Sequence, residues 1–250
     1  TTGFNFIQPQ ELLVFDRSDI NDFENGLDLE GNADGIMQPF EVLYLHVRVE
    51  NAGTNMVNGP LTMTLSTEHQ AIDILEPEFV FQEDVQVGEG TTARFMIGAN
   101  GLLPDQEEIQ FVLTVNTEDN EWIMPFTTSG GAPRIKFHGL TPPDLRIERG
   151  IDASFDIIIM NQGSVSMDQS VGTLISLSEL AEVIDDQGEY EAIQIGESVG
   201  AGEVFIVSVD EDIPWGTVLP FRLNMESELG IIQDVEFDIL VQSNPNDFPT

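Results

Sequence analysis

The run VLYLHVRVE, residues 42–50, is the clearest strand signal in the chain and decides the fold class. Its leucines and valines alternate with tyrosine, histidine, arginine and glutamate, which makes one face apolar and the other polar. A period of two residues is typical of a β-strand with one buried face. Similar short runs recur along the sequence, and no helical period extends beyond about two turns. The sequence therefore predicts an all-β protein.

An internal repeat divides the sequence into two halves. Asn51 and Gly53 follow the first clear strand, and Asn161 and Gly163 follow a similar run 110 residues later. Further landmarks repeat at or near this interval: Phe95 and Phe205, Pro104 and Pro214, Phe111 and Phe221, Leu113 and Leu223, and the turn pairs Gly88–Gly90 and Gly200–Gly202. About seven strands in each ~110 residues predict two tandem immunoglobulin-like β-sandwich domains, residues 1–129 and 130–250.

Small residues over Thr127–Pro133 predict a short linker between the halves. Four of the eight basic residues follow it: Arg134, Lys136, Arg146 and Arg149. They form either ordinary outward charges or a basic collar that docks onto the acidic first domain or onto the next molecule. Residues 4–15 form either the first strand of domain one or a strand lent to a neighbouring molecule. In the second half we expect a helical turn over 178–183 and a tight turn at Asp186–Gly188.

The charge balance is extreme, since 45 acidic residues against eight basic ones give a formal net charge of −37. This composition indicates either a surface adapted to salty water or a chain that needs cations to fold. Nucleic acid is excluded as a partner, because phosphate contacts need clustered lysine and arginine. The absence of cysteine removes disulfides and thiolate chemistry. No apolar run reaches the ~18 residues of a membrane span. The start at Thr1, without methionine, suggests processing or trimming.

The stretch EGNADGIMQPFE, residues 30–41, has the spacing of a calcium-binding loop. Such a loop has oxygen side chains at positions 1, 3 and 5, glycine at 6, a backbone carbonyl at 7 and a carboxylate at 12. The predicted ligands are Glu30, Asn32, Asp34, the carbonyl of Ile36, Gln38 directly or through water, Glu41, and Asp28 just upstream. Asp19, Asp22 and Glu24 offer further oxygens for this or a second ion. The alternative is an acidic surface turn in a protein rich in acids.

These motifs resemble the CARDB-type, cell-adhesion-related immunoglobulin-like repeats of secreted and surface proteins of bacteria and archaea, including regions of gingipain-like peptidases. The resemblance rests on the loop 30–35, residues 39–41, the strand that ends in residues 50–53, and the strand 61–67. Phe40 stands where this pattern usually has glycine. The second half lacks the acidic loop, so calcium is expected in the first half alone. The resemblance implies an extracellular, non-catalytic spacer or adhesive module.

Enzyme motifs are weak in this sequence. The histidines lack zinc-site spacing, and no nucleophile elbow or phosphate-binding loop occurs. These histidines are His46, His69 and His138. The pairs Glu107–Glu108 and Asp185–Asp186 are available for acid chemistry, and Trp122, Trp215 and Tyr44 for stacking on glycans. We expect a non-enzymatic, calcium-stabilised surface or filament subunit that self-associates or binds other surface proteins. The alternatives are a glycan-binding accessory region of a secreted hydrolase and, third, an acid hydrolase.

Overall fold

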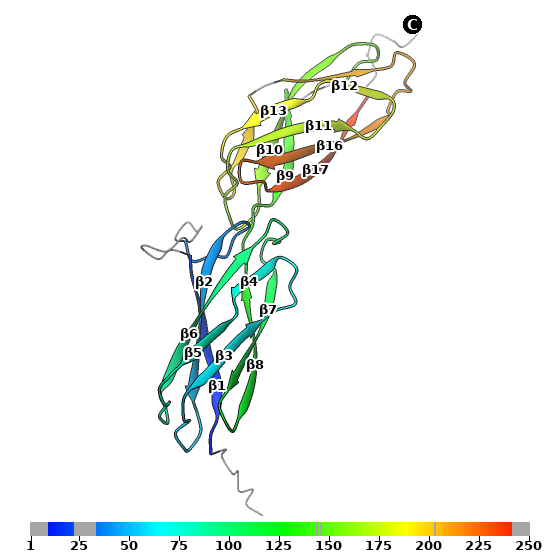
Figure 1. Cartoon of the computed structure of the whole chain (residues 1–250). Coiled ribbons are helices and arrows are strands. Elements are labelled where there is room, and N and C mark those ends of the chain that lie inside the picture. Colours follow the sequence, from blue (N-terminus) through cyan, green and yellow to red (C-terminus); the bar gives the residue numbers. More distant parts are fainter. Residues whose placement is uncertain (1–9, 23–33, 144, 146, 203, 242–250) are drawn as a thin grey trace, which may run out of the picture. The chain divides into compact units, whose positions relative to one another are not determined.

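The computed structural model describes residues 10–22, 34–143, 145, 147–202 and 204–241. All regular elements in these residues are β-strands, so the predicted all-β class is confirmed. Since no helix occurs in the described part of the chain, none there could cross a membrane. The chain divides into two compact units, Thr1–Gly131 and Ala132–Thr250 (Figure 1). The expected linker began too early, because Thr127–Ser129 continue the last strand of the first unit.

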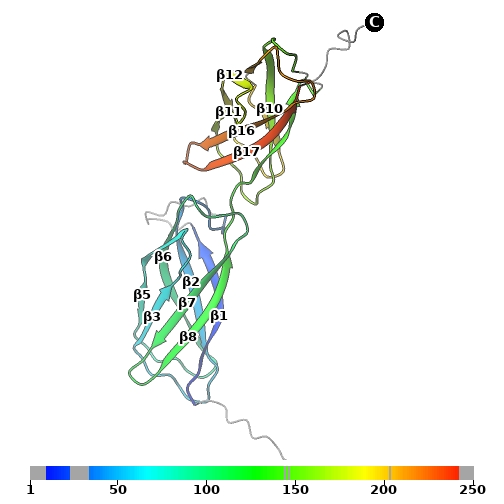
Figure 2. The same ribbon diagram turned by 90° about the vertical axis from the view of Figure 1, so that its right-hand side faces the viewer.

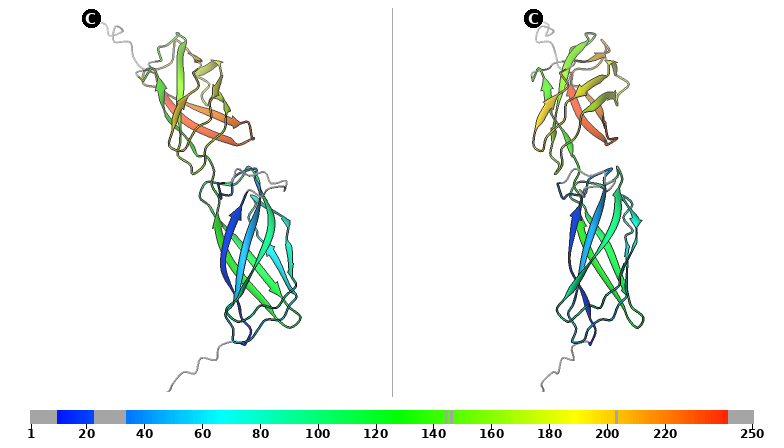
Figure 3. Two further views of the ribbon diagram at one scale, coloured as in Figure 1. Left: turned by 90° about the vertical axis from the view of Figure 1, so that its left-hand side faces the viewer. Right: turned by 60° about the vertical axis from the view of Figure 1, so that its left-hand side comes forward.

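The first unit is a β-sandwich of two antiparallel four-stranded sheets. Figure 2 shows one sheet, of order β5-β3-β7-β8, in front, and Figure 3 (left) shows the other, of order β1-β2-β6-β4. The strands are β1 Leu13–Asn21, β2 Val42–Asn51, β3 Leu61–Ser66, β4 Ile72–Glu76, β5 Glu78–Phe81, β6 Gly90–Ala99, β7 Glu108–Asn116 and β8 Glu121–Ser129. The apolar face of β2 is fully buried, with Leu43, Leu45, Val47 and Val49 in a core shared by both sheets. The alternation in the sequence therefore marks the inner face correctly.

The second unit repeats this plan. One sheet has the order β13-β11-β16-β17, and the other has the order β12-β15-β10-β14, with β9 also paired to β10. The strands are β9 Ile135–Thr141, β10 Ala153–Asn161, β11 Ser170–Ser176, β12 Ala181–Asp185, β13 Gln187–Tyr190, β14 Ser198–Gly200, β15 Phe205–Val209, β16 Val218–Ser227 and β17 Ile232–Leu240. Its core is again one apolar cluster drawn from both sheets. The single strand β6 of the first unit corresponds to β14 and β15 here.

One strand in each unit changes sheets partway along. In the first unit β4 pairs with β6, and β5, which begins two residues later, pairs with β3 in the opposite sheet. In the second unit β12 pairs with β15, and β13 pairs with β11. The expected tight turn at Asp186–Gly188 is thus the point of crossing, and Gly188 already lies in β13. A side chain at Gly188 would collide with the ring of Phe205.

The repeated asparagine closes the same turn in both units. Asn51 Nδ2 donates to the carbonyls of Asn55 (2.8 Å) and Val85 (2.9 Å), and its Oδ1 accepts from Gly53 N (3.0 Å). Asn161 makes the equivalent bonds in the second unit, to the carbonyls of residues 165 and 193 and from the amide of residue 163. Both asparagines are fully buried. At Gly53 a Cβ would lie 2.6 Å from a backbone carbonyl oxygen, so only glycine fits.

Two local expectations need correction. Gly88 corresponds to Gly196, not Gly200, because each donates its amide to the carbonyl of the repeated asparagine and has a φ near +75°. The helical turn expected over residues 178–183 is only a single turn, closed by the bond from Ala181 N to Ser178 O (3.4 Å), since Ala181 begins β12. For the N-terminal segment, the structure places residues 13–15 at the start of β1, which pairs with β2 of the same chain. Residues 4–9 lie outside the described residues.

Arg134 and Arg149 do not belong to one basic collar, and Arg146 lies outside the described residues. Arg134 donates to the carbonyl of Gln162, just beyond the end of β10. Arg149 lies before the start of β10 and stacks 4.3 Å from the centre of the Trp215 ring. Because β10 has nine residues, it separates the two arginines by roughly 30 Å. They therefore lie at opposite ends of the second sandwich.

Candidate metal centre and surface hollows

A network of carboxylates holds the described end of the predicted calcium loop. Asp22 directly follows β1, is 4% exposed, and its Oδ2 accepts from the amides of Asp34 (2.9 Å) and Gly35 (3.3 Å). Asp34 Oδ1 accepts from the amide of Ile36 (2.8 Å), which makes a tight turn. Gly35 has a φ of +75°, the left-handed conformation that favours glycine. The sequence DG at 34–35 thus forms its turn around the carboxylate of Asp22.

Gln38 joins this turn to the start of β2. Its side-chain Nε2 donates to Asp34 Oδ2, and its backbone amide donates to Glu41 Oε2 (2.9 Å). Glu41 is 7% exposed and immediately precedes β2. Met37, directly before Gln38, is fully buried and forms a parallel β-bridge with Gly130 at the end of the unit. Asp22, Asp34, Gln38 and Glu41 are therefore linked in one hydrogen-bonded series.

The structure tests the predicted ligand set only in part. Asp34, Ile36, Gln38 and Glu41 lie together in the loop, whereas Glu30, Asn32 and Asp28 lie outside the described residues. Asp22, expected only as an additional donor, is the carboxylate that organises the turn. Asp19 instead pairs with Arg17 (3.2 Å). Within the described ranges no three acidic or histidine side chains lie close enough to hold a metal ion.

The donor chemistry at this loop fits a hard divalent cation. Its described side chains offer carboxylate and amide oxygens, which calcium prefers. Two of the carboxylates, Asp22 and Glu41, are more than nine-tenths buried. Removing a carboxylate from water is costly unless hydrogen bonds or a cation compensate it. Backbone amides supply part of that compensation here, through the bonds described above.

Phe40 occupies the position where the resembling repeats usually have glycine. Its φ is +66°, in the left-handed region that disfavours side chains. The ring lies over Gly101, where a Cβ would approach Phe40 Cζ to 2.5 Å. The departure from the pattern is therefore accommodated by a glycine on the neighbouring loop.

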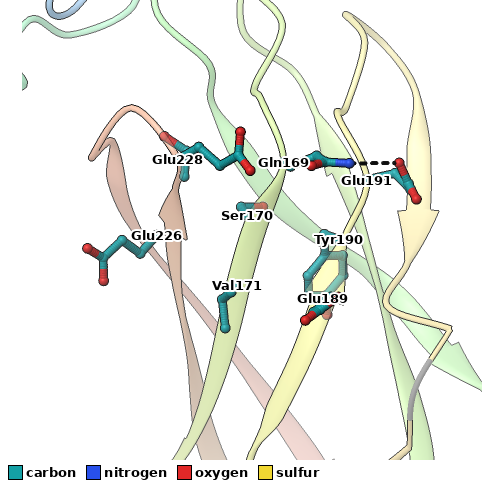
Figure 4. A pocket seen from close by; sticks show the side chains of 9 residues that line it. Gln169, Ser170, Val171, Glu189, Tyr190, Glu191, Glu226 and Glu228 are labelled. Carbon is teal, nitrogen blue, oxygen red and sulfur yellow. Dashed lines mark hydrogen bonds between the residues drawn. The ribbon is translucent and has the colours of Figure 1, made fainter.

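The second unit has an acidic hollow of about 410 Å³ on the outer face of the β13-β11-β16 sheet (Figure 4). Val171 is 41% exposed and lies in register between Glu189 on β13 and Glu226 on β16. Glu191 and Glu228 continue these two walls, and Gln169 Nε2 donates to Glu191 Oε2 (3.3 Å). The hollow therefore has an apolar floor and carboxylates on both sides of β11.

Comparisons with known proteins identify no family for this chain. No protein-family model and no curated protein matches. A solved structure of red sea bream transglutaminase aligns at 10% identity and a TM-score of 0.39, covering 94% of this chain and 32% of that one. The chain thus spans about a third of that protein. At this level the likeness supports no functional argument.

The residues considered for catalysis or glycan stacking are scattered. His69 lies 3.3 Å from Glu107 in the first unit, and His46 and His138 lie on the polar faces of β2 and β9. Asp185 and Asp186 are exposed where the strand changes sheets, and Glu108 is exposed at the start of β7. Trp122 packs against the first core, in phase with Met124 and Phe126 as predicted. Trp215 and Tyr44 lie under Arg149 and Arg94, respectively.

The pKa values of Tyr190 and Arg222, both in the second unit, are shifted by their surroundings. Burial raises the pKa of the Tyr190 phenol, and the nearby Asp156 carboxylate adds to the effect. Tyr190 is 2% exposed and donates to the carbonyl of Ile157 (3.1 Å). A hydrogen bond with Glu236 raises the pKa of the Arg222 guanidinium, with support from Asp234. Both contacts lie within the second unit and serve its structure.

Proposed function

We propose that the chain is a non-catalytic structural or adhesive module of an extracellular or cell-surface protein. In this proposal it self-associates, as a surface or filament subunit, or binds other surface proteins, and calcium stabilises its first unit. The observation that carries the proposal is the pair of buried carboxylates, Asp22 and Glu41, in the loop between β1 and β2. The duplication of the sandwich supports a spacer role, because the second unit repeats the strands without that loop.

Calcium would act on stability through the loop. Asp34 and Glu41 would hold the ion together with Glu30, Asn32 and Asp28, which lie outside the described residues, and its charge would offset carboxylates in a chain of net charge −37. Extracellular calcium modules bind with dissociation constants of ~0.1–1 mM. At a hundredfold excess over that constant, binding adds about 2.7 kcal/mol to the unfolding free energy. That is a large part of the ~5–15 kcal/mol of a typical domain.

The decisive test is electron microscopy and sedimentation of the whole chain in calcium and in a chelator. A filament subunit assembles with calcium and disperses with the chelator. A chain that is monomeric in both conditions would remove the assembly proposal and favour the accessory-region alternative. Activity against glycans or peptides would instead support a hydrolase.

The calcium claim has a separate readout in tryptophan fluorescence. Each unit holds one tryptophan, Trp122 or Trp215, so Trp215→Phe reports on the first unit and Trp122→Phe on the second. We expect the chelator to lower the urea midpoint of the first unit alone. The double variant Asp22→Asn, Glu41→Gln should remove this response, and the exposed control Glu83→Gln should keep it. Equal midpoints with and without calcium would contradict the claim.

A further inference from the structure

All the basic residues of the first unit lie on one sheet face. Residues 1–131 contain 23 acidic residues, no lysine and three arginines: Arg17, Arg48 and Arg94. These arginines lie on β1, β2 and β6, three adjacent strands of one sheet. Arg48 is opposite Arg17, and Arg94 is opposite His46, so all four side chains share the outer face. We call Arg17, Arg48 and Arg94 the arginine face.

The arginine face is held in shape by a bulge and a ring. The register of β1 shifts between Phe15 and Arg17, and Asp16 at this bulge accepts from Arg17 Nη1 (3.2 Å) and Arg48 Nε (3.0 Å). Arg94 lies 4.4 Å from the centre of the Tyr44 ring. The side chains of Arg17 and Arg48 remain 60% and 31% exposed. The guanidinium groups are therefore oriented and still reach solvent.

This arrangement has no clear advantage for the stability of the unit. Two like charges directly opposite on adjacent strands repel each other, which is unfavourable by a few tenths of a kcal/mol or more. An acidic unit could lower its own repulsion by spreading its few arginines among its carboxylates. Here they converge on one patch, where Asp16 pairs with Arg17 and Arg48 and Asp19 pairs with Arg17. A group of converging guanidinium side chains suits a contact with an acidic surface.

The acidic hollow of the second unit is complementary to the arginine face. It presents the carboxylates of Glu189, Glu191, Glu226 and Glu228 around an exposed valine floor. An arginine side chain has both required parts, an aliphatic stem for the apolar floor and a guanidinium for the carboxylates. Like the arginine face, the hollow lies on the outer face of a sheet, since Val171, Glu189 and Glu226 are all exposed.

We propose that the arginine face of one copy docks into the acidic hollow of a second copy. The inference rests on the proposed self-association and names the two surfaces that make it. Because the two surfaces differ, each copy offers one of each, and the contact can repeat without limit. Such a head-to-tail contact builds a ring if its rotation closes and an open chain if it does not.

The net charge predicts an unusual salt dependence for this contact. At ~0.01 M salt the Debye length is about 30 Å, and the repulsion between two copies of charge −37 dominates. At ~0.15 M it falls to about 8 Å, which screens the net charge more than pairs in direct contact. At ~1 M it is about 3 Å, and the contact pairs weaken as well. Association should therefore be strongest at intermediate salt.

The test is a charge-swap experiment on the whole chain, with sedimentation velocity at ~0.15 M salt and ~1 mM calcium. One variant, Arg48→Glu with Arg94→Glu, reverses the charge of two side chains of the arginine face. The other reverses the hollow, Glu189→Arg with Glu226→Arg. We expect each alone to weaken self-association about tenfold or more, and an equimolar mixture to restore it, because the swapped charges again match. The control for charge swaps outside both surfaces, Arg134→Glu with Glu118→Arg, leaves the net charge unchanged and should associate like the parent.

The outcomes separate this inference from the proposed function. If the parent chain associates and both variants associate equally well, the named contact is wrong while self-association stands. If the parent is monomeric at every salt concentration, the proposed self-association fails and the contact with it. If the arginine variants lose only retention on an anionic polysaccharide, the face binds that polymer and the second-copy contact is overturned. Urea midpoints from Trp122 and Trp215 identify any variant whose fold is damaged.

Discussion

Replacing Asn51 by alanine should destabilise the first unit severely, although the residue lies at the opposite end of β2 from the predicted calcium loop. Its side chain is fully buried and makes three hydrogen bonds to the backbone, at 2.8, 2.9 and 3.0 Å. Two of them reach different segments, the turn after β2 and the loop before β6. The substitution would remove the side-chain partner of the Gly53 amide and of the Asn55 carbonyl, whereas the Val85 carbonyl would keep its bond from the amide of Val57 (3.0 Å).

The magnitude follows from those three bonds. Each contributes about 1 kcal/mol net, and each buried group left unpaired costs about 1–3 kcal/mol. We expect the unfolding free energy to fall by about 3–5 kcal/mol, which is a third or more of the stability of a typical domain. With a urea m-value of ~1.5 kcal/mol/M, the midpoint would fall by about 2–3 M.

The assay is urea unfolding by Trp122 fluorescence in the Trp215→Phe background. Asn161→Ala, read by Trp215 in the Trp122→Phe background, should cost the second unit a similar amount, because the same three bonds recur there. The exposed Asn55→Ala is the control and should stay within about 0.5 kcal/mol of the parent. A loss below about 1 kcal/mol in Asn51→Ala would refute the view that this side chain ties the strand ends together.

Three further predictions test single positions. Phe40→Gly should change the unfolding free energy of the first unit by less than about 1 kcal/mol, because relief of the left-handed backbone offsets the lost ring contact. Gly101→Ala should lower it by about 1–3 kcal/mol, because the new methyl group collides with the Phe40 ring. Both are measured by urea unfolding with Trp122 fluorescence. The hydroxyl of Ser170 is buried and lacks a hydrogen-bond partner in the described residues, so Ser170→Ala should stabilise the second unit by about 1 kcal/mol. Ser227→Ala should destabilise it, because it removes the acceptor for the amide of Ile231 (3.0 Å). Equal effects of the two substitutions would contradict this reasoning. Because the pKa of Tyr190 is raised, the folded second unit keeps a proton that the unfolded chain releases above pH ~10. The unfolding free energy should therefore fall above that pH by about 1.4 kcal/mol per pH unit from this group. Tyr190→Phe should remove that slope in urea titrations at a series of pH values.

The sequence predicts the strands well where one face is buried. The alternation in residues 42–50 identifies the inner face of β2, and the repeated Asn-x-Gly marks the same turn in both units. Burial imposes a period of two, so such patterns are reliable. The sheet-changing strands were not predicted, because each segment is only four or five residues long and its partners are distant in sequence. The predicted correspondence of Gly88 with Gly200 in the repeat was wrong, because the residues between β14 and β15 interrupt the strand that is continuous as β6 and shift the interval between the two halves.

The candidate site was only partly visible in the sequence. Its loop was recognised from local spacing, which places Asp34, Gln38 and Glu41 near one another. The organising role of Asp22 was missed, since it depends on the end of β1 lying against the turn at Asp34–Gly35. The arginine face was missed for the same reason, because its members are 31 and 46 residues apart and meet only through strand pairing. Sequence spacing therefore finds local chelating loops and misses surfaces assembled across a sheet.

The connection between the first two strands of each unit gives the sharpest test of what the acidic loop contributes. In the first unit this connection has 20 residues between β1 and β2, and in the second unit it has 11 residues between β9 and β10. Both reach an equivalent parallel bridge, Met37 to Gly130 in one unit and Ile147 to Val241 in the other. As a flexible loop, the longer connection would cost only about 0.5 kcal/mol more to close, whereas ordering nine extra residues would cost ~1–2 kcal/mol each.

A graft can therefore separate folding from calcium binding. Replacing residues 22–41 by residues 142–152 should leave the first sandwich folded, because the second unit forms the same bridge with the shorter connection. Its urea midpoint, read by Trp122, should then be the same in calcium and in chelator. A midpoint that still rises with calcium would place the ion elsewhere on the unit. A graft that unfolds the unit would show that the carboxylate network of Asp22, Asp34 and Glu41 is required for the sandwich itself.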